Sequence, residues 1–373
     1  MTLARLLRVL SPVLVAGCTQ TTELFDSAPA CDTAGPIIEL GAGSEARPSG
    51  AIAAELRRYA LCSCTTLALS GALSITPLLR HGPIPRGDEP RAGVGSDGDV
   101  LAEGPVFVDG SLQAGGARGV ELGQGGHVGG EIRSGGHLTT EAAASATGEV
   151  FAAGDVLGPL TIDGRLHVPV GAIVSPGVNS GGVLREPVIV PPPCGCAAGP
   201  LFDIAAGVEE RRTANHNLTL PFAIDELARI EVSQSVELPC GEYFVDEIRS
   251  TAADLELRVR GRAGIFVAGD VRLDGNLDVT LEPGGELDLV IAGSLFSTGR
   301  VVGAAAAADR VRLWVGSTTV SLPDQIQLGA LVYAPSAVLT AGAGLTTAGA
   351  LFVGTLSVDG DVRITAVPGP HQR

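Results

Sequence analysis

Seven cysteines are the residues whose types and spacing most clearly allow chemistry in this chain of 373 residues. Four of them form two Cys-x-Cys pairs, at residues 62–64 and 194–196. Two such pairs can hold a zinc ion as four thiolates, or they can form disulfide bonds. Structural zinc sites usually place about two to four residues between paired ligands, and exported proteins keep their cysteines oxidised. Because the export motif described below places the chain outside the cytoplasm, we expect disulfides and no metal.

The pairing of the cysteines is constrained by their positions along the chain. Cys18 belongs to the export motif, and six others remain, namely Cys31, Cys62, Cys64, Cys194, Cys196 and Cys240. An even number predicts three disulfides. The geometry of a disulfide is difficult to reach within one Cys-x-Cys pair, so each pair should bond outward. Proximity along the chain favours Cys31 with Cys62 or Cys64, and Cys240 with Cys194 or Cys196, and the third bond would then join the two pairs.

Histidines and acidic loops are weaker candidates for chemistry. His127 and His137 each follow Gly-Gly, and neighbouring turns of a repetitive fold could stack them as metal ligands, but we expect solvent-facing turn residues. Asn-His-Asn at residues 215–217 is expected to cap a helix end. The loop at residues 95–99 lacks the later acidic ligands of an EF-hand calcium loop. The sequence thus predicts no metal and no cofactor. The other histidines are His81, His167, His216 and His371.

Composition excludes several classes of function. All 25 basic residues are arginine, which excludes a Schiff-base lysine and a phosphate-binding loop built on lysine. The net charge of −16 would repel a phosphate backbone, so we expect no nucleic-acid partner. The sequence has no Gly-x-Ser-x-Gly motif around a nucleophile. We therefore predict no catalytic residues.

Residues 1–17 have the pattern of an export signal. Arg5 and Arg8 precede a mostly apolar run at residues 9–15, and small residues follow. The run is too short to span a bilayer. Two later uncharged stretches, residues 59–79 and 325–358, are interrupted by Gly, Pro, Ser and Thr, so we do not expect them to cross a membrane.

The end of this signal, Val-Ala-Gly-Cys at residues 15–18, resembles the lipobox of bacterial lipoproteins. The resemblance implies cleavage before Cys18 and acylation of that residue, with palmitate among the acyl groups. Several acyl chains anchor a protein stably, at about 0.8 kcal/mol per buried methylene. Thr19 stands where lipoproteins of the inner membrane typically carry Asp, so the resemblance implies an outer-membrane lipoprotein at the periplasmic face or the cell surface. The alternative is a plain secretory signal.

Short apolar runs that end at glycine dominate the chain from Asp99 onward. Related phrases recur at spacings of 20 and 24 residues, which match one turn of a β-solenoid. Glycine accepts positive φ at sharp corners, and Val, Leu, Ile, Ala and Thr fill a narrow interior. We predict an all-β solenoid with short capping helices. An antiparallel β-sandwich is the alternative, because Asp-Gly also favours hairpins. The phrase apolar-Asp-Gly-x-apolar occurs at residues 108–112, 162–166, 273–277 and 358–362.

These differences in composition and sequence pattern divide the chain into seven regions. We expect a helix at residues 51–60, and a second helix within residues 194–217 that plugs one end of the solenoid. The regions are a signal peptide (1–17), a tether (18–50), an N-terminal cap and connector (51–97), a first solenoid region (98–192), a cysteine-bearing helix and strand insert (193–250), a second solenoid region (251–366) and a tail (367–373).

The second half of the chain resembles a bacterial domain of unknown function found in surface and pilus-associated proteins and in predicted lipoproteins of GC-rich, myxobacteria-like genomes. The most diagnostic segments are Tyr-Ala-Pro at residues 333–335 and Gly-Ala-Leu-Phe at residues 349–352. Residues 98–170 more loosely resemble the short turns of bactofilins. The resemblance implies a β-solenoid and a surface location, and it implies no catalytic residues. The other matching segments are residues 258–271, 286–295 and 311–316.

We therefore predict a lipid-anchored cell-envelope protein with a structural or adhesive role and no catalysis. Its expected partners are the membrane, through the acyl anchor, and an envelope polysaccharide, an envelope protein or another copy of the chain. The alternative is a polysaccharide-processing enzyme, because enzymes of that kind also use β-helices. A fold by itself does not confer the activity.

Overall fold

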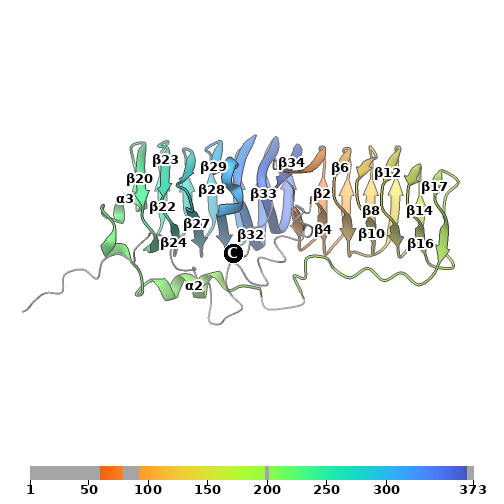
Figure 1. Ribbon diagram of the computed structural model, residues 1–373, viewed down its shortest axis with the longest axis horizontal. Helices are drawn as coiled ribbons and strands as arrows, with labels where there is room; N and C mark the ends of the chain where they lie inside the picture. The colour runs from red at the N-terminus through yellow and green to blue at the C-terminus, as the bar shows by residue number, and fades with distance from the viewer. Residues whose placement is uncertain (1–58, 79–91, 198–200, 368–373) are drawn as a thin grey trace, which may run out of the picture.

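A computed structural model describes residues 59–78, 92–197 and 201–367, which wind into a β-solenoid of about 14 turns (Figure 1). Successive turns pair in parallel, and each full turn places one strand on each of three sides. The predicted all-β solenoid is confirmed. None of the helices in the described ranges combines the length and apolar character needed to cross a bilayer.

The strands of the three sides, here called A, B and C, follow one another along the chain. Side A contains β1 (Leu61–Ser63), β4 (Val94–Ser96), β7 (Leu112–Ala114), β10 (Ile132–Ser134), β13 (Val150–Ala152), β16 (Leu166–Val168), β18 (Val183–Arg185), β21 (Gly241–Val245), β24 (Arg262–Val267), β27 (Glu286–Ile291) and β30 (Val311–Val315). Side B contains β2 (Leu67–Leu69), β5 (Val100–Ala102), β8 (Gly119–Leu122), β11 (His137–Thr140), β14 (Val156–Leu157), β19 (Arg229–Ile230), β22 (Ile248–Ser250), β25 (Val271–Leu273), β28 (Leu295–Ser297) and β31 (Thr319–Leu322).

Side C completes each turn, and two long strands bend around all three sides. Side C contains β3 (Leu73–Pro77), β6 (Val106–Val108), β9 (Gly126–Val128), β12 (Ala144–Ala146), β15 (Leu160–Ile162), β17 (Val178–Ser180), β20 (Gln234–Leu238), β23 (Leu255–Val259), β26 (Leu277–Leu281), β29 (Val301–Gly303) and β34 (Asp361–Ala366). The long strands are β32 (Ile326–Ala341) and β33 (Gly344–Val358), and the helices are α2 (Ile204–Arg211), α3 (Asp225–Ala228), η1 (Asn217–Thr219) and η2 (Ala305–Arg310).

The order of the turns in space differs from their order in the sequence. The first turn, β1 to β3, lies in the middle of the rod, and later turns stack from there to the end that carries β17 (Figure 1). Residues 186–197 and 201–203, here called the return segment, lead back along the outside. The chain then re-enters the solenoid at the opposite end, near α3, and winds back to the middle (Figure 1).

The two halves meet in one composite turn that both of them build. Strand β34 supplies its side C, and β1 and β2 supply sides A and B. Strand β1 pairs with β33 on one edge and with β4 on the other, and both pairings are parallel. The rod is therefore one continuous solenoid, with the beginning and the end of the described chain at its middle.

Alternation within each short strand builds the core. In most strands the first and third residues point inward, and they stack on the equivalent residues of the turns above and below. Leu61 aligns with Val94 and Leu351, for example, and all three are at most 1% exposed. Branched aliphatic side chains fill this narrow interior, because the pleat directs alternate residues to one face. One core runs through both halves.

Glycines in the four Asp-Gly corners are required for space and not for positive φ. None of these glycines has a positive φ, contrary to the reason given above for their recurrence. A Cβ at Gly275 would instead lie 2.2 Å from the carbonyl oxygen of Ala253, and one at Gly360 would lie 2.1 Å from that of Ala343. Each corner thus passes directly over the backbone of the neighbouring turn. The four glycines are Gly110, Gly164, Gly275 and Gly360.

Some predicted boundaries were wrong. Residues 61–77, expected in a cap, form a full solenoid turn, and residues 229–250, expected in an insert, form solenoid strands. These strands are too short to show a clear period alone, and only their neighbours reveal them. The predicted signal peptide and tether, residues 51–58 of the predicted helix, and residues 368–373 of the tail lie outside the described residues.

The close contact at the corners gives a stability test. We expect Gly275→Ala to lower the free energy of unfolding by about 1–3 kcal/mol, because the added methyl group overlaps backbone of the adjacent turn. Gly171→Ala is the control, because a Cβ there meets nothing within 4 Å. Urea unfolding monitored by circular dichroism measures both. Equal midpoints for the two variants would contradict the proposed role of the corner.

Candidate functional site

One column of outward-facing side chains extends along the whole of side A. In the C-terminal half it is aromatic and apolar, and in the N-terminal half it becomes mixed. Residues of the column lie next to each other on paired strands. The ring of Trp314 contacts that of Tyr333, and the ring of Tyr333 contacts that of Phe352. The column consists of Phe244, Phe266, Val290, Trp314, Tyr333, Phe352, Cys62, Gly95, Gln113, Arg133, Phe151, His167 and Leu184.

Helix α2 covers the aromatic part of this column. Asp203 caps the helix by accepting a hydrogen bond from the N–H of Ala206, and Ile204 and Val208 are buried against the column. Arg211 forms an ion pair with Glu242. The helix was predicted correctly within residues 194–217, but its predicted position was wrong. It lies along side A, against β21, β24 and β27, and does not plug an end.

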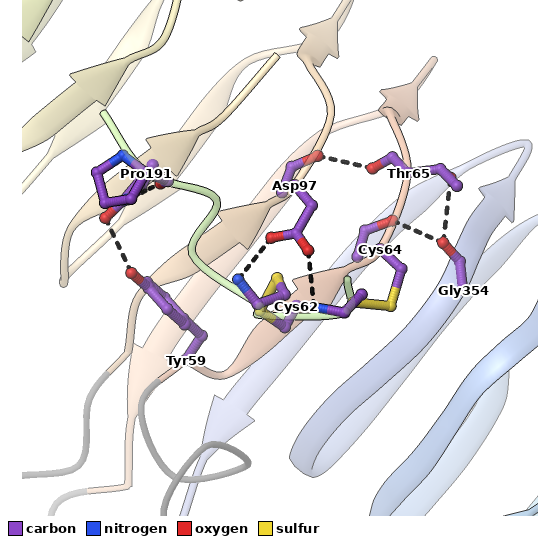
Figure 2. The surroundings of a disulfide bond; sticks show 12 residues. Tyr59, Cys62, Cys64, Thr65, Asp97, Pro191 and Gly354 are labelled. Atoms are coloured by element: carbon purple, nitrogen blue, oxygen red, sulfur yellow. Dashed lines mark hydrogen bonds between the residues drawn. A yellow bond between two sulfur atoms is a disulfide. The ribbon is translucent and has the colours of Figure 1, made fainter. Parts of the chain in front are cut away.

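Two disulfides fix the return segment to the composite turn (Figure 2). Cys62 is bonded to Cys194, and Cys64 is bonded to Cys196. The carboxylate of Asp97 lies between them and accepts hydrogen bonds from the backbone N–H groups of Cys194 at 2.7 Å and Cys196 at 2.9 Å. The two sulfur bridges and one carboxylate thus hold two residues of the return segment against β1 and β4.

The composite turn is tied to the C-terminal half at the same place. The backbone N–H of Cys64 donates to the carbonyl of Val353 at 2.9 Å, and the N–H of Thr65 donates to that of Gly354 at 3.0 Å. The Thr65 hydroxyl also donates to the Gly354 carbonyl (Figure 2). The first turn, the last turns and the return segment therefore meet at one junction.

The predicted bond between the two Cys-x-Cys pairs is confirmed, but the predicted bonds from Cys31 and Cys240 to these pairs are wrong. Proximity along the chain favoured bonds to Cys31 and Cys240, whereas each observed bridge spans 132 residues and joins one Cys-x-Cys pair to the other. The return segment brings the two pairs together in space. Cys240 is also disulfide-bonded. Cys18 and Cys31 themselves lie outside the described residues.

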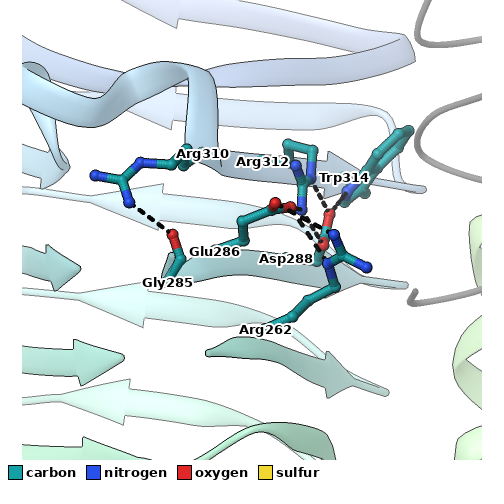
Figure 3. Close-up of polar contacts among 7 residues, drawn as sticks. All are labelled: Arg262, Gly285, Glu286, Asp288, Arg310, Arg312 and Trp314. Carbon is teal, nitrogen blue, oxygen red and sulfur yellow. Dashed lines mark hydrogen bonds and ion pairs between the residues drawn. The ribbon is translucent and has the colours of Figure 1, made fainter. Parts of the chain in front are cut away.

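A buried charge network lies beside the aromatic column (Figure 3). Arg312 donates two hydrogen bonds to Asp288, at 2.6 and 2.7 Å, and another to Glu286 at 2.8 Å. Trp314 Nε1–H donates to Asp288 at 2.9 Å, and Arg262 binds Glu286. Asp288 is fully buried. Both carboxylates are thus occupied by cationic or N–H donors.

Charges within the network determine the protonation states. Burial alone would raise the pKa of Glu286, but the attraction of Arg312 and Arg262 outweighs it and lowers the pKa below the usual range. Burial likewise lowers the pKa of Arg312, and Asp288 and Glu286 reverse this and raise it. A carboxylate held ionised between arginines is a poor proton donor at neutral pH. Glu286 is therefore poorly suited to act as a general acid.

The other candidate residues have structural contacts. His127 in β9 lies on side C and His137 in β11 lies on side B, so the two histidines do not stack. His127 Nδ1 lies 2.9 Å from Ser145 Oγ, and His137 Nδ1 accepts from the N–H of Asp155. His167 stacks on Phe151, its Nδ1 contacts Glu186 at 2.6 Å, and its buried Nε2 has no hydrogen-bond partner. Across residues 59–78, 92–197 and 201–367, no three His, Cys, Asp or Glu side chains converge as a metal site would require.

The capping prediction at residues 215–217 is confirmed. Asn215 donates to the carbonyls of Arg211 and Arg212 at the end of α2. His216 and Asn217 exchange hydrogen bonds with the backbone of residues 242 and 244 in β21. The loop at residues 95–99 is also structural, because the Asp99 carboxylate accepts from the N–H groups of residues 118 and 119.

Sequence reasoning missed Asp97, Asp288, Arg312 and Trp314. A signal for the network was present, because charged residues occupy equivalent positions of two apolar strands 24 residues apart, one turn of the solenoid. Asp97 gave no such signal, since its partners are nearly 100 residues away along the chain.

Comparison with known proteins agrees with the resemblance in the second half. Residues 199–369 match the model of a family described as a domain of unknown function (DUF7305). No curated protein matches the sequence. Among solved structures, the competence-associated pilin ComZ from Thermus thermophilus matches at 12% identity over 83% of this chain and 70% of that chain, with a TM-score of 0.27. A TM-score this low does not establish a shared fold.

The two neighbouring disulfides close nearly the same loop, which predicts redundancy. Replacing all four cysteines, Cys62, Cys64, Cys194 and Cys196, with alanine should cost about 5 kcal/mol of stability, the chain entropy of a loop of this length. Replacing one bonded pair should cost less than half of that, because the other bridge still closes the loop. Urea unfolding of the three variants measures this. Equal and additive losses for the two pairs would contradict it.

The buried network predicts a large effect from removing one charge. Arg312→Met should lower the free energy of unfolding by about 3–5 kcal/mol, because it leaves Asp288 buried without its cation. Arg363→Met is the control, because the Arg363–Asp361 pair is exposed and should contribute less than about 1 kcal/mol. Thermal unfolding by calorimetry compares them, and a small loss for Arg312→Met would refute the assignment.

Proposed function

We propose that this protein is a lipid-anchored cell-envelope protein with a structural or adhesive role. The paired disulfides at the junction are the observation that carries the proposal. Disulfides persist outside the cytoplasm and are rare within it. This chemistry agrees with the export signal and with Cys18 as the acylated residue.

The fold supports a mechanical role. A solenoid with one continuous core resists local collapse, since every turn is paired on both edges except at the ends. The bridges join the first turn to the return segment, and the pairing of β1 with β33 attaches the last turns at the same junction. A rod of this kind is suited to hold its surface at a fixed geometry in an oxidising environment.

The location of the composite turn determines where an acyl anchor would attach to the rod. Residues 1–58 lead into Tyr59, which lies beside the junction at the middle of the rod (Figure 2). An acyl anchor at Cys18 would therefore attach the rod at its middle and leave both ends remote from the attachment point. Thr19 after Cys18 supports the outer membrane as the location.

The charge network supports a non-enzymatic role over polysaccharide processing. Glu286 and Asp288 are a carboxylate pair of the kind a glycosidase uses, but both are bound by arginines. We propose an envelope polysaccharide, an envelope protein or another copy of the chain as the partner on the exposed sides. Cleavage of a glycan in a panel of envelope polysaccharides would contradict the non-enzymatic role.

The anchor is tested by labelling cells with palmitate. We expect the wild-type chain to incorporate the label and to partition into detergent, because the acyl groups at Cys18 hold it in the membrane. Cys18→Ser should remain unlabelled and should either be released or accumulate unprocessed. Thr21→Ser is the matched control and should behave as the wild type. Label in Cys18→Ser equal to that in the wild type would refute the anchor.

Protease treatment of intact cells distinguishes the cell surface from the periplasm.

A further inference from the structure

One end of the rod is open. The last turn of the N-terminal half, residues 169–185, is here called the end coil. Strand β17 pairs with β15, and β18 pairs with β16, and within the described ranges neither has a neighbour on its outer edge. In a parallel ladder, alternate residues direct their N–H and C=O groups to opposite neighbours. The end coil therefore presents a row of backbone donors and acceptors beyond the rod (Figure 1).

The hydrophobic core is also uncovered at this end. Val183 continues the inward column above Leu166, yet Val183 is 44% exposed whereas Leu166 is fully buried. Val178 continues the column of Leu160 and is only partly buried. Beside this uncovered layer, Val170 is 77% exposed and Ile173 is 61% exposed. Apolar surface and unpaired strand edges together are the features that favour association with another chain.

All of the end coil except Arg185 also lacks the charge that would prevent such contact. Residues 166–184 contain no Asp, Glu, Lys or Arg, although the chain as a whole carries a net charge of −16. Two copies would repel each other over most of their surfaces, and the uncharged end is where they can approach closely. Natural sheet edges that must stay monomeric commonly carry charged residues. On this edge only Arg185, the last residue of β18, is charged, and its side chain donates to the carbonyls of Pro169 and Ala172 within the same coil.

The opposite end is closed. Leu227 in α3 is fully buried, Ile230 in β19 is nearly so, and Leu220, Phe222 and Ile224 pack on the same core. This segment covers the first full turn of the C-terminal half (Figure 1). A rod with one open end and one covered end can join a second copy at the open end but cannot propagate as a filament.

We propose that two copies of this chain associate through their end coils across a twofold axis and form a closed dimer. A twofold axis places the same edge of each copy against its mate, so that each supplies the donors and acceptors the other lacks. The apolar layer of Val178 and Val183 from each copy then becomes the centre of a core that continues across both rods. This inference does not depend on the lipid anchor.

Sedimentation of the full chain carrying Cys18→Ser, which removes the acylation site, tests the proposal. We expect a species of twice the chain mass. Val170→Arg and Ile173→Arg should each convert it to monomer, because an arginine at a twofold interface meets its own copy. Both positions are more than half exposed, so the folded monomer accommodates the new side chain. Leu218→Arg is the matched control, because Leu218 is 95% exposed near the closed end, and this variant should stay dimeric.

Hydrogen exchange localises the contact and confirms folding. Amides of residues 173–185 should be protected in the dimer and should lose protection in Val170→Arg, while the composite turn stays protected in both. A monomeric parent protein, or dimers that persist in both arginine variants, would refute the proposal. Species that grow beyond the dimer with concentration would refute the closed form.

Discussion

Backbone hydrogen bonding between successive parallel turns is the interaction on which the rest of this structure depends. Most strands contain three residues, and strands this short have no independent stability. They persist because each strand between the two end turns aligns with a neighbour on both edges and stacks its inward side chains on those of the next turn. The composite turn applies the same rule to the two ends of the described chain. Strand β1 pairs with β33 as it pairs with β4, so the core crosses from one half to the other without a seam.

Starting the solenoid in the middle imposes a topological requirement. After the last turn of the N-terminal half, the chain must travel the length of the rod before it can build the other half. The outward column of side A accommodates this segment, with aromatic residues beneath α2 and with Gln113 donating to the Pro191 carbonyl further along. The disulfides fix the crossing point. The burial of aromatic residues on the outside of a solenoid, which is unusual for a surface, follows from this return path.

The interior and the exterior of the rod contain different types of residue. Aliphatic residues fill the core almost exclusively, although Tyr243 lies within it, where burial raises the pKa of its phenol to about 12. The hydroxyl donates to the carbonyls of Pro239 and Cys240, which satisfies it. Charged residues lie mainly outside, as exposed pairs or in the covered network around Asp288. The surfaces that remain exposed are the uncovered sides and the open end.

The sequence by itself determined the fold class, because a solenoid repeats the same short-range pattern in every turn. Val, Leu and Ile at alternate positions and glycine at corners specify each turn locally. The capping role of residues 215–217 followed for the same reason, since the helix lies immediately before it. Only the tertiary structure decided the order of turns, the place of α2 and the partners of Cys62, Cys64, Cys194 and Cys196. The order of turns and the cysteine partners depend on contacts between segments more than 100 residues apart, where proximity along the chain is a poor guide. The place of α2 depends on three strands, β21, β24 and β27, which only the stacked turns bring side by side. The positions of the corner glycines were evident from the sequence, but the reason for them was not. A side chain at these positions would overlap the backbone of the neighbouring turn, which lies close only in the stacked structure.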